Sequence, residues 1–179
     1  MIRALIPLAD GCEEMEAVIV ADVLRRANWE VVLAGVNGVE PVTASRGVAL
    51  LPDESWDELV LTDFDLIVLP GGLEGTLALC KHEGVLETLK LFDLEERWIA
   101  AICAAPLVLH TAGVLDNRAF TCYPGVEDEI GDRSEDIVVI DGNIITSQGP
   151  GTAFDFALAL IETIDSAAAA DKVRAALLY

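Results

Sequence analysis

Three short runs of the sequence are almost continuously apolar, and helical sequence follows each of them. The runs are IRALIPLA (2–9), DLIVLPGG (65–72) and WIAAI (98–102). A strand that is apolar on both faces must be covered on both faces, which is typical of a parallel sheet packed between helices. Strands that alternate with helices indicate the same architecture. The pattern therefore predicts an α/β fold with a mostly parallel sheet.

The remaining segments extend this alternation along the chain. Asp141 and Gly142 lie between two apolar stretches, which is a strong signal for a hairpin. Gly113 stands where a helix is expected to end. The expected elements are a helix over 13–27, a strand over 29–36, extended segments over 41–52 around a turn at 45–47, a helix over 76–96 broken near Gly84, a hairpin over 136–147, a helix over 152–164 and a short alanine-rich helix at the end.

Length and charge limit the classes of function. The 179 residues are 53% apolar, which is enough for one sizeable core, so we expect a single domain over 1–179. Because 31 acidic residues oppose 11 basic ones, the net charge is −20. Such a charge repels nucleic acid and anionic lipid, so neither is an expected partner.

The sequence gives no sign of secretion or of a membrane span. The first residues lack the pattern of a signal peptide. The uncharged run 98–115 contains Pro106, His110 and Gly113, which favour a buried strand followed by a buried helix. We therefore expect a cytoplasmic protein.

The four cysteines do not form the pattern of a disulfide framework or of a zinc site. They are Cys12, Cys80, Cys103 and Cys122, with no CxxC pair and no cluster with histidine at zinc spacing. We expect reduced, individual thiols and no metal. Only Cys103 has a setting that suggests reactivity.

Cys103 lies between the end of one strand and the start of the next helix. The small residues Ala101, Ala104 and Ala105 allow a sharp turn there, as in a nucleophile elbow. Pro106 suits the first turn of the helix, whose free amides and positive dipole end would favour a thiolate. On this basis Cys103 is a candidate nucleophile. The alternative is that it is a buried, inert thiol, as free cysteines commonly are.

Glu16 is the candidate partner of this thiol. Within the helix over 13–27, Ile19, Val20 and Val23 follow it at helical spacing, so its carboxyl lies on an apolar stripe. Buried there, it would have a raised pKa and could serve as a general acid or base. The alternative is a solvated acid at the rim of the helix.

The pair Gly71 and Gly72 ends a predicted strand beside the same crevice. Glycine allows the backbone to approach a reacting carbonyl closely. The amides of Gly72 and Ala104 are therefore candidates for an oxyanion hole. An ordinary turn is the alternative interpretation.

Several segments together resemble a known family. GCEEMEAV, the SRGV turn, DLIVLPGG, IAAICAAPLVL and ITSQGPGTAFDFAL occur in the order and at the spacing found in the ThiJ/PfpI superfamily. They are most similar to the branch that contains the Parkinson-disease-associated protein and its bacterial relatives. The resemblance extends over nearly the whole chain.

The resemblance implies a flavodoxin-like three-layer sandwich, of the type shared with class I glutamine amidotransferases, and a homodimer. It implies that Cys103 is the reactive cysteine and that Glu16 contacts its sulfur. Arg26 and Arg46 carry over as candidate anion contacts near the dimer-related site, with surface solubility as the alternative for both.

The activity that the resemblance implies is a glutathione-independent glyoxalase, which converts methylglyoxal to lactate, or a deglycase acting on early glycation adducts. No metal or organic cofactor is expected. In the glyoxalase reaction a Cys103 thiolate would form a hemithioacetal with the substrate. The alternative is an oxidative-stress sensor or redox-regulated chaperone that works through oxidation of Cys103.

Two positions depart from related patterns. Tyr123 stands where several relatives have a histidine before a proline, so a cysteine–histidine dyad is not expected. Ala104 stands where the peptidase-like members have a histidine directly after the nucleophile. We therefore do not expect peptidase activity.

Overall fold

The computed structural model describes residues 1–179 and is organised by one seven-stranded sheet. The strand order is β5-β2-β1-β6-β7-β9-β8, and all pairs are parallel except β8 with β9. The strands are β1 (Arg3–Leu8), β2 (Glu30–Gly35), β5 (Glu54–Ser55), β6 (Leu66–Leu69), β7 (Trp98–Ile102), β8 (Val138–Asp141) and β9 (Ile144–Ser147). The mostly parallel sheet predicted from the apolar runs is confirmed.

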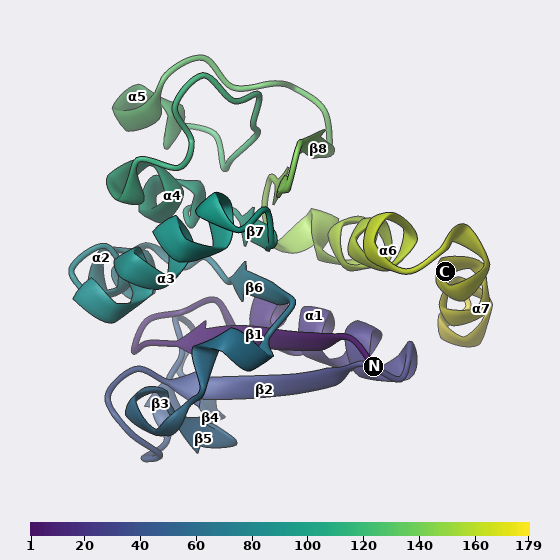
Figure 1. The fold of residues 1–179 in the computed structure, drawn as a ribbon, viewed down its shortest axis with the longest axis horizontal. Coiled ribbons are helices and arrows are strands. Elements are labelled where there is room, and N and C mark those ends of the chain that lie inside the picture. The colour runs from purple at the N-terminus through teal and green to yellow at the C-terminus, as the bar shows by residue number, and fades with distance from the viewer.

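Helices cover both faces of the sheet, as Figure 1 shows. One layer is formed by α1, α6 and α7, and the other by α2, α3 and α4. Their bounds are α1 (Glu14–Arg26), α2 (Leu73–Leu79), α3 (Glu83–Leu94), α4 (Pro106–Ala112), α6 (Ala153–Ile164) and α7 (Ala167–Leu177). This is the expected flavodoxin-like three-layer arrangement.

The central strands are apolar on both faces because each face packs into a separate core. In β6 the alternate residues Leu66 and Val68 belong to the core under α1 and α6, whereas Ile67 and Leu69 belong to the core under α3 and α4. All four are at most 1% exposed. The period of two along a strand thus supplies both cores from one apolar run.

Several short elements connect the main strands and helices. The extended segments around residues 45–47 form a separate hairpin of β3 (Val42–Thr43) and β4 (Ala49–Leu50), as predicted. Four short elements had no signal in the apolar pattern: β5, the 3-10 turns η1 (Trp56–Glu58) and η2 (Leu61–Asp63), and α5 (Glu127–Ile130). A further 3-10 turn, η3 (Pro150–Thr152), precedes α6.

The helical stretch after β6 differs from the prediction in the place where it is interrupted. The break predicted near Gly84 lies at 80–82, and Gly84 is inside α3. The reason is a cap: His82 precedes α3, and its Nδ1 accepts a hydrogen bond of 3.2 Å from the amide of Val85. A side chain that satisfies a free amide defines a helix start more strongly than an interior glycine does.

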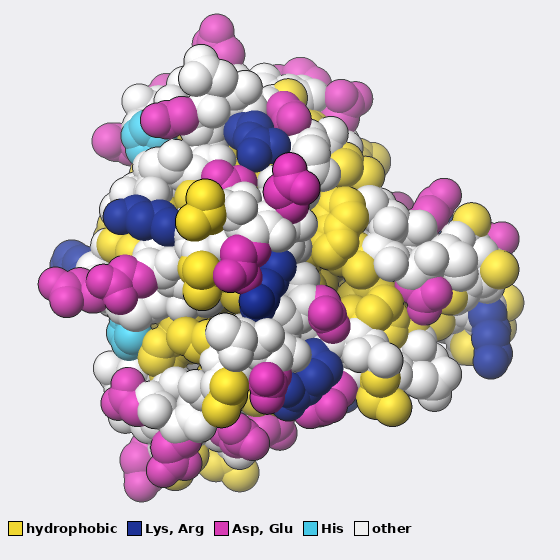
Figure 2. All heavy atoms as spheres, in the orientation of Figure 1, with side chains coloured by type: hydrophobic (Ala, Val, Ile, Leu, Met, Phe, Trp, Pro, Cys, Tyr) yellow, Lys and Arg dark blue, Asp and Glu magenta, His cyan; other side chains and the backbone are white.

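Acidic side chains are spread over the visible face of the molecule rather than gathered in one patch, with isolated lysines and arginines among them (Figure 2). No helix is both long and apolar enough to cross a membrane.

The packing of α6 generates a prediction about stability. Phe156 on α6 is fully buried in the core shared with α1. We expect Phe156→Ala to lower the free energy of unfolding in urea by about 3–5 kcal/mol, because it leaves a cavity in a packed core. The matched control is Leu94→Ala at the end of α3, where the side chain is 82% exposed. Equal effects of the two substitutions would contradict this description of the core.

Candidate functional site

Cys103 lies in a strained turn directly after β7 and before α4. Its φ of 64° is in the left-handed region, which residues with a side chain rarely adopt. Two hydrogen bonds hold its backbone in place. The Cys103 amide donates to the carbonyl of Ser147 (3.0 Å), and the Cys103 carbonyl accepts from the amide of Tyr123 (2.8 Å). The predicted elbow is thus present, and contacts from distant segments stabilise the strain.

Small buried residues surround this turn. Ala101 and Ala105 are fully buried and Ala104 is 4% exposed, so no larger side chain would fit without displacing its neighbours. Pro106 begins α4, where its missing amide hydrogen costs nothing. The local sequence therefore accounts for the shape of the elbow.

Glu16 on α1 is fully buried beside this turn. Its Oε2 accepts a hydrogen bond of 2.7 Å from the amide of Gly71, and its Oε1 has no hydrogen-bond partner in the protein. The prediction from the apolar stripe is confirmed, because the carboxyl faces the core and not solvent. The unpartnered oxygen leaves one position at which a proton can be gained or lost.

Gly71 allows the carboxyl and the thiol to approach each other. A Cβ at position 71 would lie 2.6 Å from the Cβ of Cys103 and 2.8 Å from Oε2 of Glu16. Both distances are shorter than van der Waals contact, so any side chain at this position would separate the pair. The role of Gly71 is therefore steric. Its position in the sequence Pro-Gly-Gly did not predict this role.

The two predicted oxyanion-hole amides are close to the sulfur. Hydrogen bonds from the amides of Gly72 and Ala104 act on Cys103 in the direction that lowers its pKa. Gly72 has a φ of 83°, and an added Cβ there would lie 2.3 Å from the carbonyl oxygen of Gly11. The residue must be glycine for its amide to reach this place.

Burial dominates the electrostatics of the pair. Desolvation raises the pKa of Glu16 to about 7, although the hydrogen bonds from Gly71 and Cys103 act in the opposite direction. Desolvation, followed by the negative charge of Glu16, raises the pKa of Cys103 to about 12. The carboxylate of Glu16 therefore opposes ionisation of the thiol, whereas the hydrogen bond from the thiol favours the carboxylate.

The raised pKa of Cys103 corrects the sequence prediction of a thiolate favoured by the helix dipole. Amide hydrogen bonds lower this pKa, but desolvation and the neighbouring carboxylate have the larger effect. At neutral pH the resting site thus holds a thiol beside a carboxyl group that titrates near pH 7. Such a carboxyl is suited to accept the thiol proton when the sulfur attacks a substrate.

An open cavity of about 580 Å³ leads to the sulfur. Cys103 and Ala104 form part of its lining, and Arg46 from the turn between β3 and β4 also lines it, as the resemblance suggested. Beside Arg46, the hydroxyl of Ser45 donates to Oε2 of Glu13 (2.7 Å). The predicted residues Cys103, Ala104, Gly72 and Arg46 therefore share one cavity.

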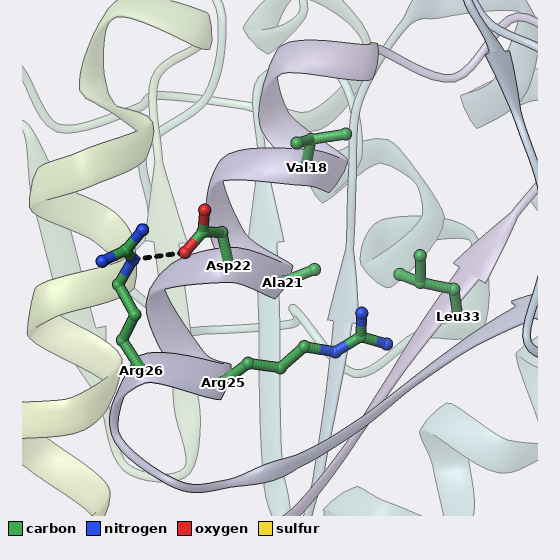
Figure 3. A pocket seen from close by; sticks show the side chains of 6 residues that line it. All are labelled: Val18, Ala21, Asp22, Arg25, Arg26 and Leu33. Atoms are coloured by element: carbon green, nitrogen blue, oxygen red, sulfur yellow. Dashed lines mark hydrogen bonds and ion pairs between the residues drawn. The ribbon is translucent and has the colours of Figure 1, made fainter.

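Arg26 does not reach this cavity within one chain. It lies in a separate cavity of about 510 Å³ on the outer side of α1 (Figure 3). There it forms an ion pair with Asp22, one turn earlier on the same helix. The proposed contact of Arg26 with an anion at a dimer-related site stays a prediction.

The other three cysteines lie outside the pair. Burial, together with the charge of Glu14, raises the pKa of Cys12 to about 11. Burial, together with the charge of Glu127, raises the pKa of Cys122 to about 11. Cys80 is partly exposed at the end of α2. None of the three has the combination of elbow, carboxyl and cavity that surrounds Cys103.

Sequence reasoning missed several residues that line the cavity. Leu73, Val126 and Pro150 had no role in the prediction, and Tyr123 was noted only for the histidine that it replaces. These residues come from α2, from the segment before α5 and from η3. For Leu73 and Pro150 the available signal was their position shortly after a strand, since such residues share the crevice of a parallel sheet. Tyr123 and Val126 follow α4 and had no such signal.

Comparisons with known proteins agree on the family. The model of the DJ-1/PfpI family matches residues 2–163. The Parkinson disease protein 7 homolog of Danio rerio is 44% identical over 182 residues, which cover 98% of this chain and 96% of that protein. The protein named glutathione-independent glyoxalase DJR-1.2 of Caenorhabditis elegans is 38% identical over 165 residues, covering 90% of this chain and 87% of that protein.

A solved structure gives the same result for the fold. The structure described as Toxoplasma gondii DJ-1, oxidized, is 38% identical in sequence and superposes with a TM-score of 0.94. The match covers 100% of this chain and 99% of that one. The resemblance stated from the motifs is thus confirmed at the level of the family and of the fold.

The raised pKa of Glu16 generates a prediction about the pH dependence of stability. A carboxyl with a higher pKa in the folded than in the unfolded state stabilises the fold at low pH, and this contribution is lost as pH rises through the folded pKa, here about 7. Glutamine does not titrate, so its free energy of unfolding lacks this loss. We expect the free energy of unfolding of Glu16→Gln, relative to that of the wild type, to increase by about 3 kcal/mol from about pH 5 to about pH 8. Urea unfolding of both proteins at each pH measures this.

The control for this comparison is Glu87→Gln, which changes an exposed glutamate on α3. The difference in free energy of unfolding between Glu87→Gln and the wild type is expected to be the same at both pH values. A constant difference for Glu16→Gln as well would mean that the buried carboxyl keeps an ordinary pKa.

Proposed function

The chain belongs to the DJ-1/PfpI family, and we propose that it is a cofactor-free glyoxalase that converts methylglyoxal to lactate through Cys103. The observation that carries the proposal is the buried carboxyl of Glu16 next to the thiol of Cys103, which lines an open cavity. A relative at 38% identity is named a glutathione-independent glyoxalase, which supports it. Early glycation adducts, which present a similar carbon to the sulfur, are a second proposed class of substrate.

The first step in this proposal forms the bond between sulfur and substrate. The Cys103 sulfur attacks the aldehyde carbon while the thiol proton moves to the carboxylate of Glu16. The aldehyde oxygen becomes negative and is stabilised by the amides of Gly72 and Ala104. Glu16 then returns the proton to this oxygen, which gives the hemithioacetal and restores the carboxylate for the next step.

The second step is an internal transfer of hydrogen. Glu16 removes the proton from the former aldehyde carbon and returns one to the neighbouring ketone carbon, through an enediol. The first carbon is oxidised to a thioester and the second is reduced to an alcohol, so no external oxidant or reductant is needed. Water then cleaves the thioester, which releases lactate and restores the thiol.

The raised pKa values support Glu16 as the base. A thiol with a pKa of about 12 is a weak nucleophile unless its proton is removed during the attack. A carboxyl with a pKa of about 7 is available for this purpose at neutral pH. The alternative is a sensor in which peroxide oxidises the same sulfur, and the measurement of turnover separates the two proposals.

We expect purified protein to form lactate from methylglyoxal without glutathione, and Cys103→Ser to abolish this while the far-ultraviolet circular dichroism is unchanged. The matched control is Cys80→Ser, which removes a thiol outside the cavity. Absence of turnover in the wild type, with a gain of two oxygen atoms on Cys103 in mild peroxide by mass spectrometry, would favour the sensor instead.

The role of Glu16 generates a prediction about the pH profile. Because the base must be deprotonated, kcat/KM for methylglyoxal is expected to rise with pH and to level off above about 7. In Glu16→Gln we expect a loss of about 10²-fold or more, with no inflection near this pH. Glu87→Gln serves again as the control. An unchanged profile in Glu16→Gln would show that another group accepts the proton.

A further inference from the structure

The cavity above Cys103 is larger than a three-carbon aldehyde requires. Its volume of about 580 Å³ lies in the range of sites that hold ligands of about drug size. Cys103 is one of the lining residues. A small substrate whose carbonyl reaches the sulfur therefore leaves most of the volume for a substituent. The walls of the cavity therefore indicate what that substituent is.

One side of the cavity carries apolar side chains that are unusually exposed. Leu73 at the start of α2 is 62% exposed, and Tyr123 is 50% exposed. Val126 and Pro150 line the cavity with them. Large apolar surfaces grouped around a concave site are typical of a ligand-binding wall.

Tyr123 is fixed beside the nucleophile. Its amide donates to the carbonyl of Cys103 at 2.8 Å. Its ring lies along Gly149, where an added Cβ would be 3.1 Å from Cδ2 of the ring. The ring is thus held from the backbone and from one face, while half of its surface stays open. Such a ring offers a flat apolar surface close to the reacting sulfur, which suits another aromatic ring.

The charged residues in the lining are Glu13, Glu74 and Arg46. Glu13 is 8% exposed and accepts from Ser45, and Glu74 also lines the cavity. Two carboxylates against the one guanidinium of Arg46 disfavour an anionic substituent. A neutral apolar group would lie against Tyr123 and Leu73 instead.

We propose that the cavity selects 2-oxoaldehydes with a bulky apolar substituent, aryl groups above all, and that Tyr123 is a residue that determines this specificity. As a statement about turnover it rests on the function proposed above. As a statement about which group binds beside Cys103 it is independent of that function.

The test uses two reagents that differ in the substituent alone. Chloroacetone and phenacyl chloride both alkylate a thiol: a carbon–sulfur bond forms, chloride leaves, and the thiol proton passes to the buffer. The rate of labelling at Cys103 is measured by mass spectrometry for each reagent and divided by its rate with glutathione. We expect the wild type to favour the phenacyl reagent by about tenfold or more, which is the scale of discrimination by apolar pockets.

Variants at the wall show which surface gives the preference. Tyr123→Phe is expected to keep it, because the ring remains, and Tyr123→Ala to reduce it to about threefold or less. Leu73→Ala changes an exposed side chain and is expected to reduce it partly. The control is Leu94→Ala on the surface of α3. We expect this variant to have the same ratio of phenacyl to chloroacetone labelling as the wild type. A wild-type ratio near one, or an unchanged ratio in both Tyr123→Ala and Leu73→Ala, would overturn the proposal.

The enzymatic counterpart separates this proposal from the proposed function. The values of kcat/KM for phenylglyoxal and methylglyoxal are expected to show the same preference and the same dependence on Tyr123. Turnover of both substrates with equal efficiency would refute the specificity and leave the glyoxalase function intact. Preferential phenacyl labelling without any turnover would refute the glyoxalase function and leave the binding preference intact.

Discussion

The site depends on one close contact, the approach of the buried Glu16 carboxyl to the Cys103 thiol. Three segments far apart in the sequence create it: α1 supplies the acid, the residues after β6 supply a position without a side chain, and the turn after β7 supplies the sulfur. Each of these features lowers the stability of the fold. A carboxyl is buried, a cysteine has a positive φ, and Gly71 has no side chain that could pack. Strain and buried charge of this kind are retained where they serve chemistry.

This contact also changes how the nucleophile is activated. A thiol at the start of a helix is expected to ionise readily, and the amides of Gly72 and Ala104 do act in that direction. They are outweighed because the sulfur is desolvated and the neighbouring group is itself an acid. In the proposed reaction the proton is therefore transferred to Glu16, and the amides stabilise the charge that develops on the substrate. The acid and the amides thus have separate tasks in that proposal.

The sequence predicted those features that depend on local pattern. The apolar runs predicted the central strands, the stripe on α1 predicted the burial of Glu16, and the alanines with Pro106 predicted the elbow. It did not predict the raised pKa of Cys103, because desolvation depends on everything that packs around the sulfur. It also did not predict the walls of the cavity, because Leu73, Tyr123 and Pro150 come together only through the strand order. Short elements such as β5 and α5 lack enough residues to show a period.

The two backbone hydrogen bonds of Cys103 have a consequence for biosynthesis. Every other component of the contact, from α1 to β7, precedes residue 104, whereas the bonds that hold the elbow come from Tyr123 and from Ser147 at the end of β9. A chain still emerging from the ribosome therefore carries the thiol and its acid without the turn that joins them. The conformation that places the thiol beside Glu16 is thus complete only when β9 lies beside β7.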